Sequence, residues 1–194
     1  KSRVINDVSF NFNDKIFENV GLKNNFNLYF KNLNSIGKNV LDYKSSPQFE
    51  IQSLIEFNSE LPLMKSSIDK DQTVIPRISL RINPSDMKNH TEDKREINTD
   101  NIFNINRLGI DDSLESGNSL TLGINYKSEN KEDNNKFIEL KLASVLRDEV
   151  EDNIPTQTTL NKKNSNIFGS ADYNLSENIN IDYKFATDNK VENF

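Results

Sequence analysis

The chain has 194 residues and carries 24 Lys and Arg against 30 Asp and Glu, which gives a formal net charge of −6. This acidic balance argues against nucleic acid as a main partner, because phosphate binding needs clustered positive charge. The mean hydropathy is −0.72, and no window approaches the roughly 20 apolar residues that a spanning helix needs, so helical membrane proteins are excluded.

Cysteine is absent, and histidine occurs once, at His90. The lack of cysteine excludes disulfides, thiolate metal sites and cysteine nucleophiles, and the single histidine excludes metal sites built from several histidines. The chain begins at Lys1 without an initiator Met or a signal peptide, and it ends at Phe194 directly after a strand-like stretch. We therefore expect an internal fragment of a longer chain.

Apolar residues recur at every second position through most of the chain, and this period predicts β-strands. In chain order, the alternating segments are Val8–Phe12, Phe26–Phe30, Phe49–Phe57, Ile78–Ile82, the short stretch Ile102–Asn106, Leu120–Tyr126 and Ile138–Leu142. No segment between them shows a helical period.

The last two alternating runs give the clearest pattern. Ile167–Leu175 and Ile179–Phe185 are joined by the turn-forming residues Ser176–Asn178, and this arrangement predicts a β-hairpin. Together with the earlier segments, it leads us to expect about nine strands, with antiparallel neighbours throughout.

The connections between these strands alternate in length. Residues Asn130–Asn135 form a modest polar link, whereas Pro84–Asp100 and Val150–Asn164 are long and charged. Short turns at one end and long polar loops at the other are typical of outer-membrane β-barrels. A soluble sandwich more often has uniformly short turns and strands of about 5–6 residues.

The two faces of the expected strands differ in composition. One face carries Asn, Asp, Lys, Arg and Glu, as a water-filled lumen would, and the other carries Leu, Ile, Phe, Val and Tyr, as lipid contact requires. We predict an all-β fold, an antiparallel up-and-down transmembrane β-barrel, of which this chain forms an arc. About nine strands are too few to close a wide transporter barrel. The lumen-facing candidates are Arg77, Arg81, Asn83, Asn125 and Lys127.

Two other architectures fit the same alternation. A complete barrel of about eight to ten strands, or a curved open sheet, would use the same strands. A β-sandwich also buries one face of each strand and exposes the other.

Catalytic and metal-binding patterns have no support in the sequence. His90 lies in a charged loop without a nucleophile signature, so we expect a solvated histidine. Asp111, Asp112 and Glu115 invite a calcium interpretation, but the alternate spacing of oxygen ligands in an EF-hand is missing. No dinucleotide-binding, Walker A, hydrolase or zinc-protease motif occurs. We expect neither an enzyme nor a cofactor.

The segment Asn101–Gly117 is less generic than the rest. Its residues Asn106, Arg107, Gly109, Asp111, Asp112 and Gly117 suggest a folded loop at the barrel mouth. Within it, Arg107 could pair with Asp111 and Asp112 in a turn that the two glycines allow to bend.

This segment and the strand after it, DNIFNINRLGIDDSLESGNSLTLGINYK, preceded by IPRISLRINP, resemble the C-terminal barrel of the LPS-assembly protein family LptD, the organic solvent tolerance proteins. The resemblance covers Val74–Lys127. It departs from the family at Leu108, where an aromatic residue is common, and in the spacing of the glycines and aspartates.

The resemblance implies a function and several partners. It implies a bacterial outer-membrane barrel that receives lipopolysaccharide from a periplasmic Lpt bridge, through a domain missing from this chain, and inserts it into the outer leaflet. It also implies an LptE-like lipoprotein plug in the lumen and contact with outer-membrane lipid. Residues 1–194 would form part of the barrel domain, with long polar loops near 84–118 and 150–164. The alternative functions are a porin or other transport barrel, and a secreted β-sandwich binding module.

The loop lengths also predict a topology. Long loops of outer-membrane barrels usually face the cell exterior, and short turns face the periplasm. The two long loops should therefore lie on one side, which requires an even number of strands between them. We assign Ile102–Arg107 to the first long loop, because this leaves two crossings.

Overall fold

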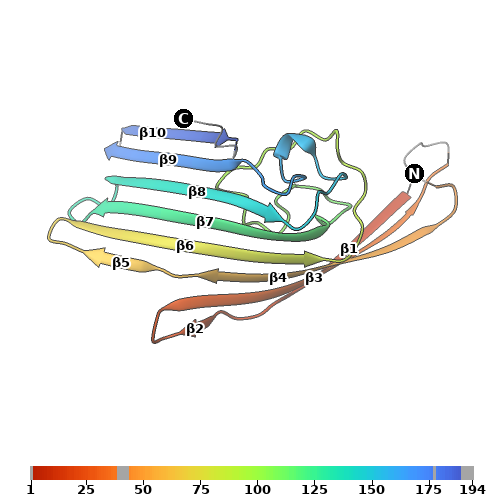
Figure 1. Ribbon diagram of the computed structural model, residues 1–194, viewed down its shortest axis with the longest axis horizontal. Helices are drawn as coiled ribbons and strands as arrows, with labels where there is room; N and C mark the ends of the chain where they lie inside the picture. Colours follow the sequence, from red (N-terminus) through yellow and green to blue (C-terminus); the bar gives the residue numbers. More distant parts are fainter. Residues whose placement is uncertain (1, 39–43, 177, 189–194) are drawn as a thin grey trace.

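The computed structural model describes residues 2–38, 44–176 and 178–188. These residues form one antiparallel β-sheet of ten strands, and its only helical element is a single 3₁₀ turn at Thr156–Thr158 (Figure 1). The strands are β1 (Ser2–Asn11), β2 (Lys15–Phe17), β3 (Leu22–Ile36), β4 (Gln48–Glu60), β5 (Leu63–Ser66), β6 (Lys70–Asn83), β7 (Gly117–Asn130), β8 (Phe137–Arg147), β9 (Ile167–Ser176) and β10 (Ile179–Thr187).

The strands follow each other across the sheet as a meander. The order is β1-β3-β4-β6-β7-β8-β9-β10, while the short strands β2 and β5 pair with β3 and β6. β1 and β10 are the two edges, so the sheet is an open arc in the part of the chain that the structure describes. The prediction of an antiparallel all-β arc is confirmed. The predicted C-terminal hairpin is present as β9 and β10, although Glu177 of its turn lies outside the described residues.

The strand count differs from the expected nine in two ways. The short strands β2 and β5 were not predicted, because three or four residues are too few to show an alternating pattern. Residues Ile102–Asn106 form turns rather than a strand, which agrees with their assignment to the first long loop.

Burial in this sheet is inverted relative to a soluble protein. On β6, Ile78 and Leu80 are 46% and 39% exposed, whereas Ser79 and Arg81 between them are 0% and 2% exposed. The same inversion holds on β4, where Ile55 is exposed and Glu56 is buried. We call the face that bears Ser79 and Arg81 the polar face, and the opposite face the apolar face. A face of exposed Ile, Leu and Phe suits contact with lipid rather than water.

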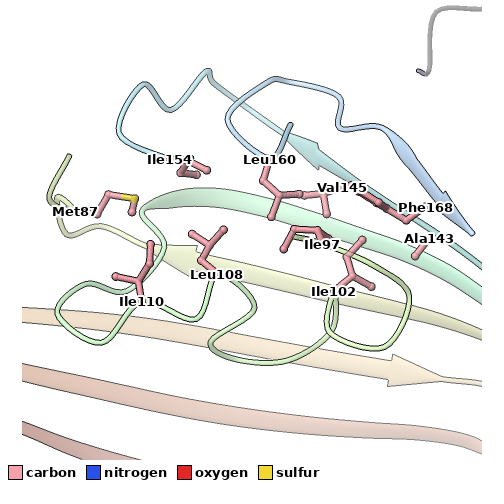
Figure 2. Packing of buried hydrophobic residues seen from close by; sticks show 10 residues of the cluster. All are labelled: Met87, Ile97, Ile102, Leu108, Ile110, Ala143, Val145, Ile154, Leu160 and Phe168. Carbon is pink, nitrogen blue, oxygen red and sulfur yellow. The ribbon is translucent and has the colours of Figure 1, made fainter. Parts of the chain in front are cut away.

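The polar face is buried because the chain covers it with its own loops. The first long loop (residues 84–116) and the second long loop (residues 148–166) fold over the sheet at the end where β6 and β8 finish and β7 begins, at the right in Figure 1. Between loops and sheet lies a hydrophobic cluster, shown in Figure 2, and its members are Met87, Ile97, Ile102, Leu108, Ile110, Ala143, Val145, Ile154, Leu160 and Phe168. Each fully buried aliphatic side chain contributes about 2 kcal/mol. The core of the molecule is therefore small and lies on the polar side of the sheet.

The two long loops lie at the same end of the sheet and bind each other. The backbone N–H of His90 donates to the Asn153 carbonyl at 2.9 Å, and that of Thr156 donates to the Thr91 carbonyl at 3.2 Å. Two strands, β7 and β8, separate the loops along the chain, which is the even number that the topology requires. At the opposite end, the turn after β7 meets the turn before β6 through Lys131 N–H and the Asp69 carbonyl.

None of the described segments forms a helix that is long and apolar enough to cross a membrane.

The inverted burial predicts which side chains meet lipid. Because the chain has no cysteine, a single fluorophore can be attached at Leu122→Cys on the apolar face or at Asn125→Cys on the polar face of β7. In vesicles that contain brominated lipid, we expect strong quenching at position 122 and little at position 125, because only the first side chain points to the acyl chains. Equal quenching at both positions would contradict the inverted sheet.

Candidate functional site

Five charged side chains meet in a buried cluster at the first long loop, and they come from three strands and the loop itself. We call the residues Glu56 on β4, Arg81 on β6, Arg107 and Glu115 in the first long loop, and Arg147 on β8 the charge cluster. All five are at most 9% exposed. Charges are rarely buried this completely unless they are paired.

Glu115 is the centre of the cluster. Its carboxylate accepts a two-pronged contact from Arg107, with Nε at 2.6 Å and Nη2 at 2.5 Å. Arg147 donates to the same carboxylate through Nη2, and its Nη1 donates to the Ser116 carbonyl at 2.8 Å. The backbone carbonyl of Glu115 accepts from Asn83 Nδ2 at 2.8 Å. Glu115 thus ties the loop to β6 and β8 at once.

Arg107 completes its hydrogen bonds on β7. Its Nη1 donates to Thr121 Oγ1 at 2.8 Å, and its Nη2 donates to Ser119 Oγ at 3.2 Å. Both hydroxyls belong to the polar face, where β-strand periodicity places every second residue. The guanidinium is therefore held by the sheet on one side and by Glu115 on the other.

Arg81 links the sheet to the part of the first long loop around Asn104. Its Nε donates to Glu56 Oε1 at 3.1 Å, and its Nη2 donates to the Asn104 carbonyl at 2.5 Å. Glu56 also accepts hydrogen bonds from Asn27 and Asn58, at 3.1 and 2.9 Å. The strands β3, β4 and β6 contribute to these contacts, and β7 and β8 contribute through the contacts of Arg107 and Arg147. The charge cluster therefore fixes the loop against five strands of the sheet.

The charges set the ionisation of Glu115. Burial opposes the charged form of this carboxyl, but the guanidinium groups of Arg107 and Arg147 outweigh it and hold the pKa of Glu115 well below its usual range. Glu115 is therefore ionised at neutral pH and offsets part of the charge of the three arginines.

Asn106 and the two predicted glycines shape the loop. Asn106 Oδ1 accepts the backbone N–H of Ile110, and its Nδ2 donates to the Ile110 carbonyl, both at 3.1 Å. Gly109, inside this turn, has φ of +61°, and Gly117, at the start of β7, has φ of +75°. These left-handed conformations favour glycine. A Cβ at Gly117 would also lie 2.6 Å from Glu151 Oε1.

The expected pairing of Arg107 with Asp111 and Asp112 is wrong. Arg107 turns inward to Glu115, whereas Asp111 is exposed and Asp112 faces Arg3 on β1 at 3.1 Å. Spacing alone did not distinguish Glu115 from its neighbours, because all three carboxylates lie within nine residues of Arg107.

The expectation of a solvated His90 is also wrong. Only 15% of its side chain is exposed, and it lies between two carboxylates, with Nδ1 3.1 Å from Asp93 and Nε2 3.2 Å from Asp112. In the part of the chain that the structure describes, no three His, Asp or Glu side chains are grouped as metal ligands. Asp112 and Glu115 instead face cationic side chains.

All five lumen-facing candidates lie on the polar face, but in two different settings. Arg81 and Asn83 are covered by the first long loop and are almost completely buried. Arg77 and Lys127 are partly open, with 45% and 39% of their side chains exposed, and Asn125 donates to Glu139 at 2.8 Å. That this face borders a lumen remains a prediction.

Four members of the charge cluster were not predicted to form ion pairs, namely Glu56, Arg81, Glu115 and Arg147. The alternation does mark Glu56, because it places this charged residue on the same face of its strand as Leu54 and Asn58. Glu56 and Arg147 have partners 25 or more residues away along the chain, at Arg81 and Glu115, and alternation carries no information on such distances.

The comparisons place the chain in a family. The family model LptD, LPS transport system D, matches residues 22–194. The chain belongs to the LptD family. This confirms the resemblance seen around Asn101–Gly117, and it makes the ten-stranded sheet an arc of a β-barrel. No curated protein matches the chain. LptD proteins are outer-membrane transport barrels rather than enzymes, and membership implies a role in lipopolysaccharide transport and assembly.

The charge cluster of this LptD chain predicts a large effect of a small change. Glu115→Gln leaves three buried arginines with Glu56 as their remaining carboxylate in the cluster, so we expect the free energy of unfolding to fall by about 3–5 kcal/mol. Denaturant unfolding of the full-length barrel in detergent measures this. Glu132→Gln, in the exposed turn after β7, is the matched control and should change stability by less than about 0.5 kcal/mol.

The low pKa of Glu115 also predicts a pH dependence in this LptD barrel. Because the pKa is lower in the folded than in the unfolded state, the stabilisation is complete above about pH 4.3 and is lost as the pH falls below it. The stability difference between the wild type and Glu115→Gln should therefore shrink on acidification. A difference that stays constant between neutral pH and about pH 2 would show that Glu115 is not the titrating group.

Proposed function

We propose that residues 1–194 form part of an outer-membrane barrel domain that inserts lipopolysaccharide into the outer leaflet. The observation that carries this proposal is the inverted burial of the sheet, in which exposed Ile78, Leu80 and Leu122 form one face and the loop-covered Ser79 and Arg81 belong to the other. Membership in the LptD family supplies the class of cargo.

The two faces suit the movement of a large amphiphile. Lipopolysaccharide combines acyl chains with an anionic, sugar-rich head group, so its path needs a hydrated polar side and an apolar side continuous with the bilayer. Alternation along each strand provides both sides within one sheet. This process needs no covalent chemistry, and the polar face is built from hydrogen-bonding and charged side chains rather than from a nucleophile with its base.

The covered polar face has a role in this proposal. The first long loop closes the polar face at the end of the sheet where β6 finishes and β7 begins. The charge cluster holds the loop there through Arg107 and Glu115. Asn106, Gly109 and Gly117 give the loop its shape, while Asp112 joins it to β1 through Arg3. An outer-membrane barrel that carries large cargo must remain sealed against small solutes, and a clamped loop supplies that seal.

The proposed partners follow from the same arrangement. An LptE-like lipoprotein plug would occupy the part of the polar face that the loops leave open, where Arg77, Asn125 and Lys127 lie. Cargo would arrive from a periplasmic Lpt bridge through a further domain, and outer-membrane lipid would surround the apolar face. The long loops would then face the cell exterior.

The two alternative functions lose support. A secreted sandwich would pack the apolar face on a second sheet, whereas Ile124 and Leu142 on this face are each 45% exposed. A porin would share the architecture, but the family match covers residues 22–194.

The role of the clamped loop is tested in cells. We expect Arg107→Gln in the full-length protein to make the outer membrane permeable to large hydrophilic antibiotics and to reduce lipopolysaccharide labelled at the cell surface, because the loop loses its contacts with Glu115, Ser119 and Thr121. Glu132→Gln is the control. Normal assembly with unchanged permeability and unchanged surface lipopolysaccharide would count against the proposal.

The orientation of the loops gives a separate test. Protease sites engineered beside Lys94 and beside Lys162, which are both exposed, lie in the two long loops at one end of the sheet. We expect protease added to intact cells to cut at both sites. Cleavage at only one of the two would show that this topology is wrong.

A further inference from the structure

Three asparagines interrupt the apolar face near the end of the sheet where the long loops lie. The alternation of β-strands places Asn6 of β1 on this face, two residues before Val8. It also places Asn32 and Asn34 of β3 there, directly after Phe30 on the same face. Asn6 and Asn32 are opposite each other in the register of the two strands. We call Asn6, Asn32 and Asn34 the amide patch.

The side chains of the amide patch bind one another and retain hydrogen-bonding capacity. Asn32 Oδ1 accepts from Asn6 Nδ2 at 3.2 Å and from Asn34 Nδ2 at 2.7 Å. Asn32 Nδ2 donates to the Glu50 carbonyl at 3.2 Å. The Oδ1 atoms of Asn6 and Asn34 accept no hydrogen bond from the described residues. Two carbonyl oxygens can therefore accept from a partner outside the chain.

Exposed apolar side chains enclose the amide patch. In the register of the sheet, Asn34 lies between Val4 of β1 and Phe49 of β4, which are 58% and 67% exposed. Asn32 lies beside Ile51 of β4, which is 60% exposed. The row of Val4 and Phe49 is nearer to the long loops than the row of Asn32, so the apolar surface continues beyond the patch. The amide patch is therefore part of the surface that suits lipid.

The surface around the amide patch is uncharged. The side chains of β1, β3 and β4 that share this part of the apolar face are Val4, Asn6, Val8, Phe30, Asn32, Asn34, Phe49, Ile51 and Ser53. None of these side chains offers an ionic partner to a phosphate. The free oxygen atoms of the patch need a donor instead, such as an amide N–H or a hydroxyl group. A glycerol diester lipid joins its chains through ester groups, which only accept.

We propose that the amide patch binds a membrane lipid that carries amide and hydroxyl groups where its acyl chains begin. This inference rests on the proposed function, because that function places bilayer lipid against the apolar face. The Oδ1 atoms of Asn6 and Asn34 accept hydrogen bonds from the lipid, while Phe49 and Ile51 contact its chains. Binding of this kind gives partners to polar groups that hydrocarbon would leave without any.

The test compares two brominated lipids as quenchers of a fluorescent amino acid in the full-length protein, in phosphatidylcholine vesicles. Sphingomyelin and phosphatidylcholine share the phosphocholine head group, but only sphingomyelin has an amide N–H and a hydroxyl group. The fluorescent amino acid replaces Phe49 beside the patch or Tyr173 on β9, which is also on the apolar face. At position 49 we expect sphingomyelin to associate about fivefold more strongly than phosphatidylcholine, the effect of one neutral hydrogen bond. At position 173 the two lipids should quench alike.

Three variants show whether the amides cause this preference. Asn34→Leu should reduce the preference at position 49, and the double variant Asn6→Leu/Asn34→Leu should abolish it. An apolar side chain suits this face, so both variants should fold, and heat-dependent gel mobility checks this. The matched control is Asn134→Leu in the exposed turn after β7, which should leave the preference unchanged.

The outcomes separate this inference from the proposed function. Equal quenching by the two lipids at position 49, the same preference at positions 49 and 173, or a preference that the folded double variant retains would each overturn the amide patch as a lipid site. The lipid-facing barrel stands in all three cases. Absence of quenching by either lipid at both positions would instead overturn the proposed function, because the apolar face would then not meet the bilayer.

Discussion

The contact of Glu115 with Arg107 and Arg147 is the interaction on which the rest of this structure depends. It joins the first long loop directly to β8, and to β7 through the hydrogen bonds of Arg107, in a place where all these side chains are buried. A buried ion pair of this kind is costly to break. Replacing the whole cluster with apolar side chains would stabilise a soluble protein equally well. A charge cluster adds geometric specificity, because each planar guanidinium donates in fixed directions and so fixes where its acceptors lie. The loop is therefore held in a single position.

The cluster exists because the sheet has its polarity inverted. A strand that presents Ile78, Leu80 and Ile82 to lipid must place its polar residues on the opposite face. Two of those residues, Arg81 and Asn83, find hydrogen-bond partners in the first long loop, where the carbonyls of Asn104 and Glu115 accept from them. The small hydrophobic cluster around Ile102 and Leu160 then adds packing energy on the same side. Charge pairing and apolar packing thus act together on one loop.

The sequence predicts the strands well because their period is local. Alternation in segments such as Leu120–Tyr126 and Ile179–Phe185 depends only on which neighbours face lipid, and these segments became β7 and β10. The loop was harder to predict. Its existence follows from a run of polar residues, but its course depends on partners far away in the sequence, such as Glu56 for Arg81 and Gln52 for the Leu114 N–H.

The candidate site was predicted in part for the same reason. Asn106, Gly109 and Gly117 act within a few residues of themselves, and the structure places them in the loop turns as expected. Arg107 was identified, but its partner was not, because Asp111, Asp112 and Glu115 are equally plausible by spacing. Burial distinguishes the three carboxylates, because only Glu115 is buried, at the side of the loop that faces β7 and β8.

Hydrogen–deuterium exchange of the wild-type full-length protein tests most directly whether the first long loop is clamped to the polar face. The backbone N–H groups of Ile102, Gly109 and Leu114 are all hydrogen-bonded within the protein, the last to the side chain of Gln52 on β4. We predict that peptides covering residues 101–116 exchange as slowly as those from β7. Exchange as fast as that of the exposed turn at residues 131–135 would contradict the account.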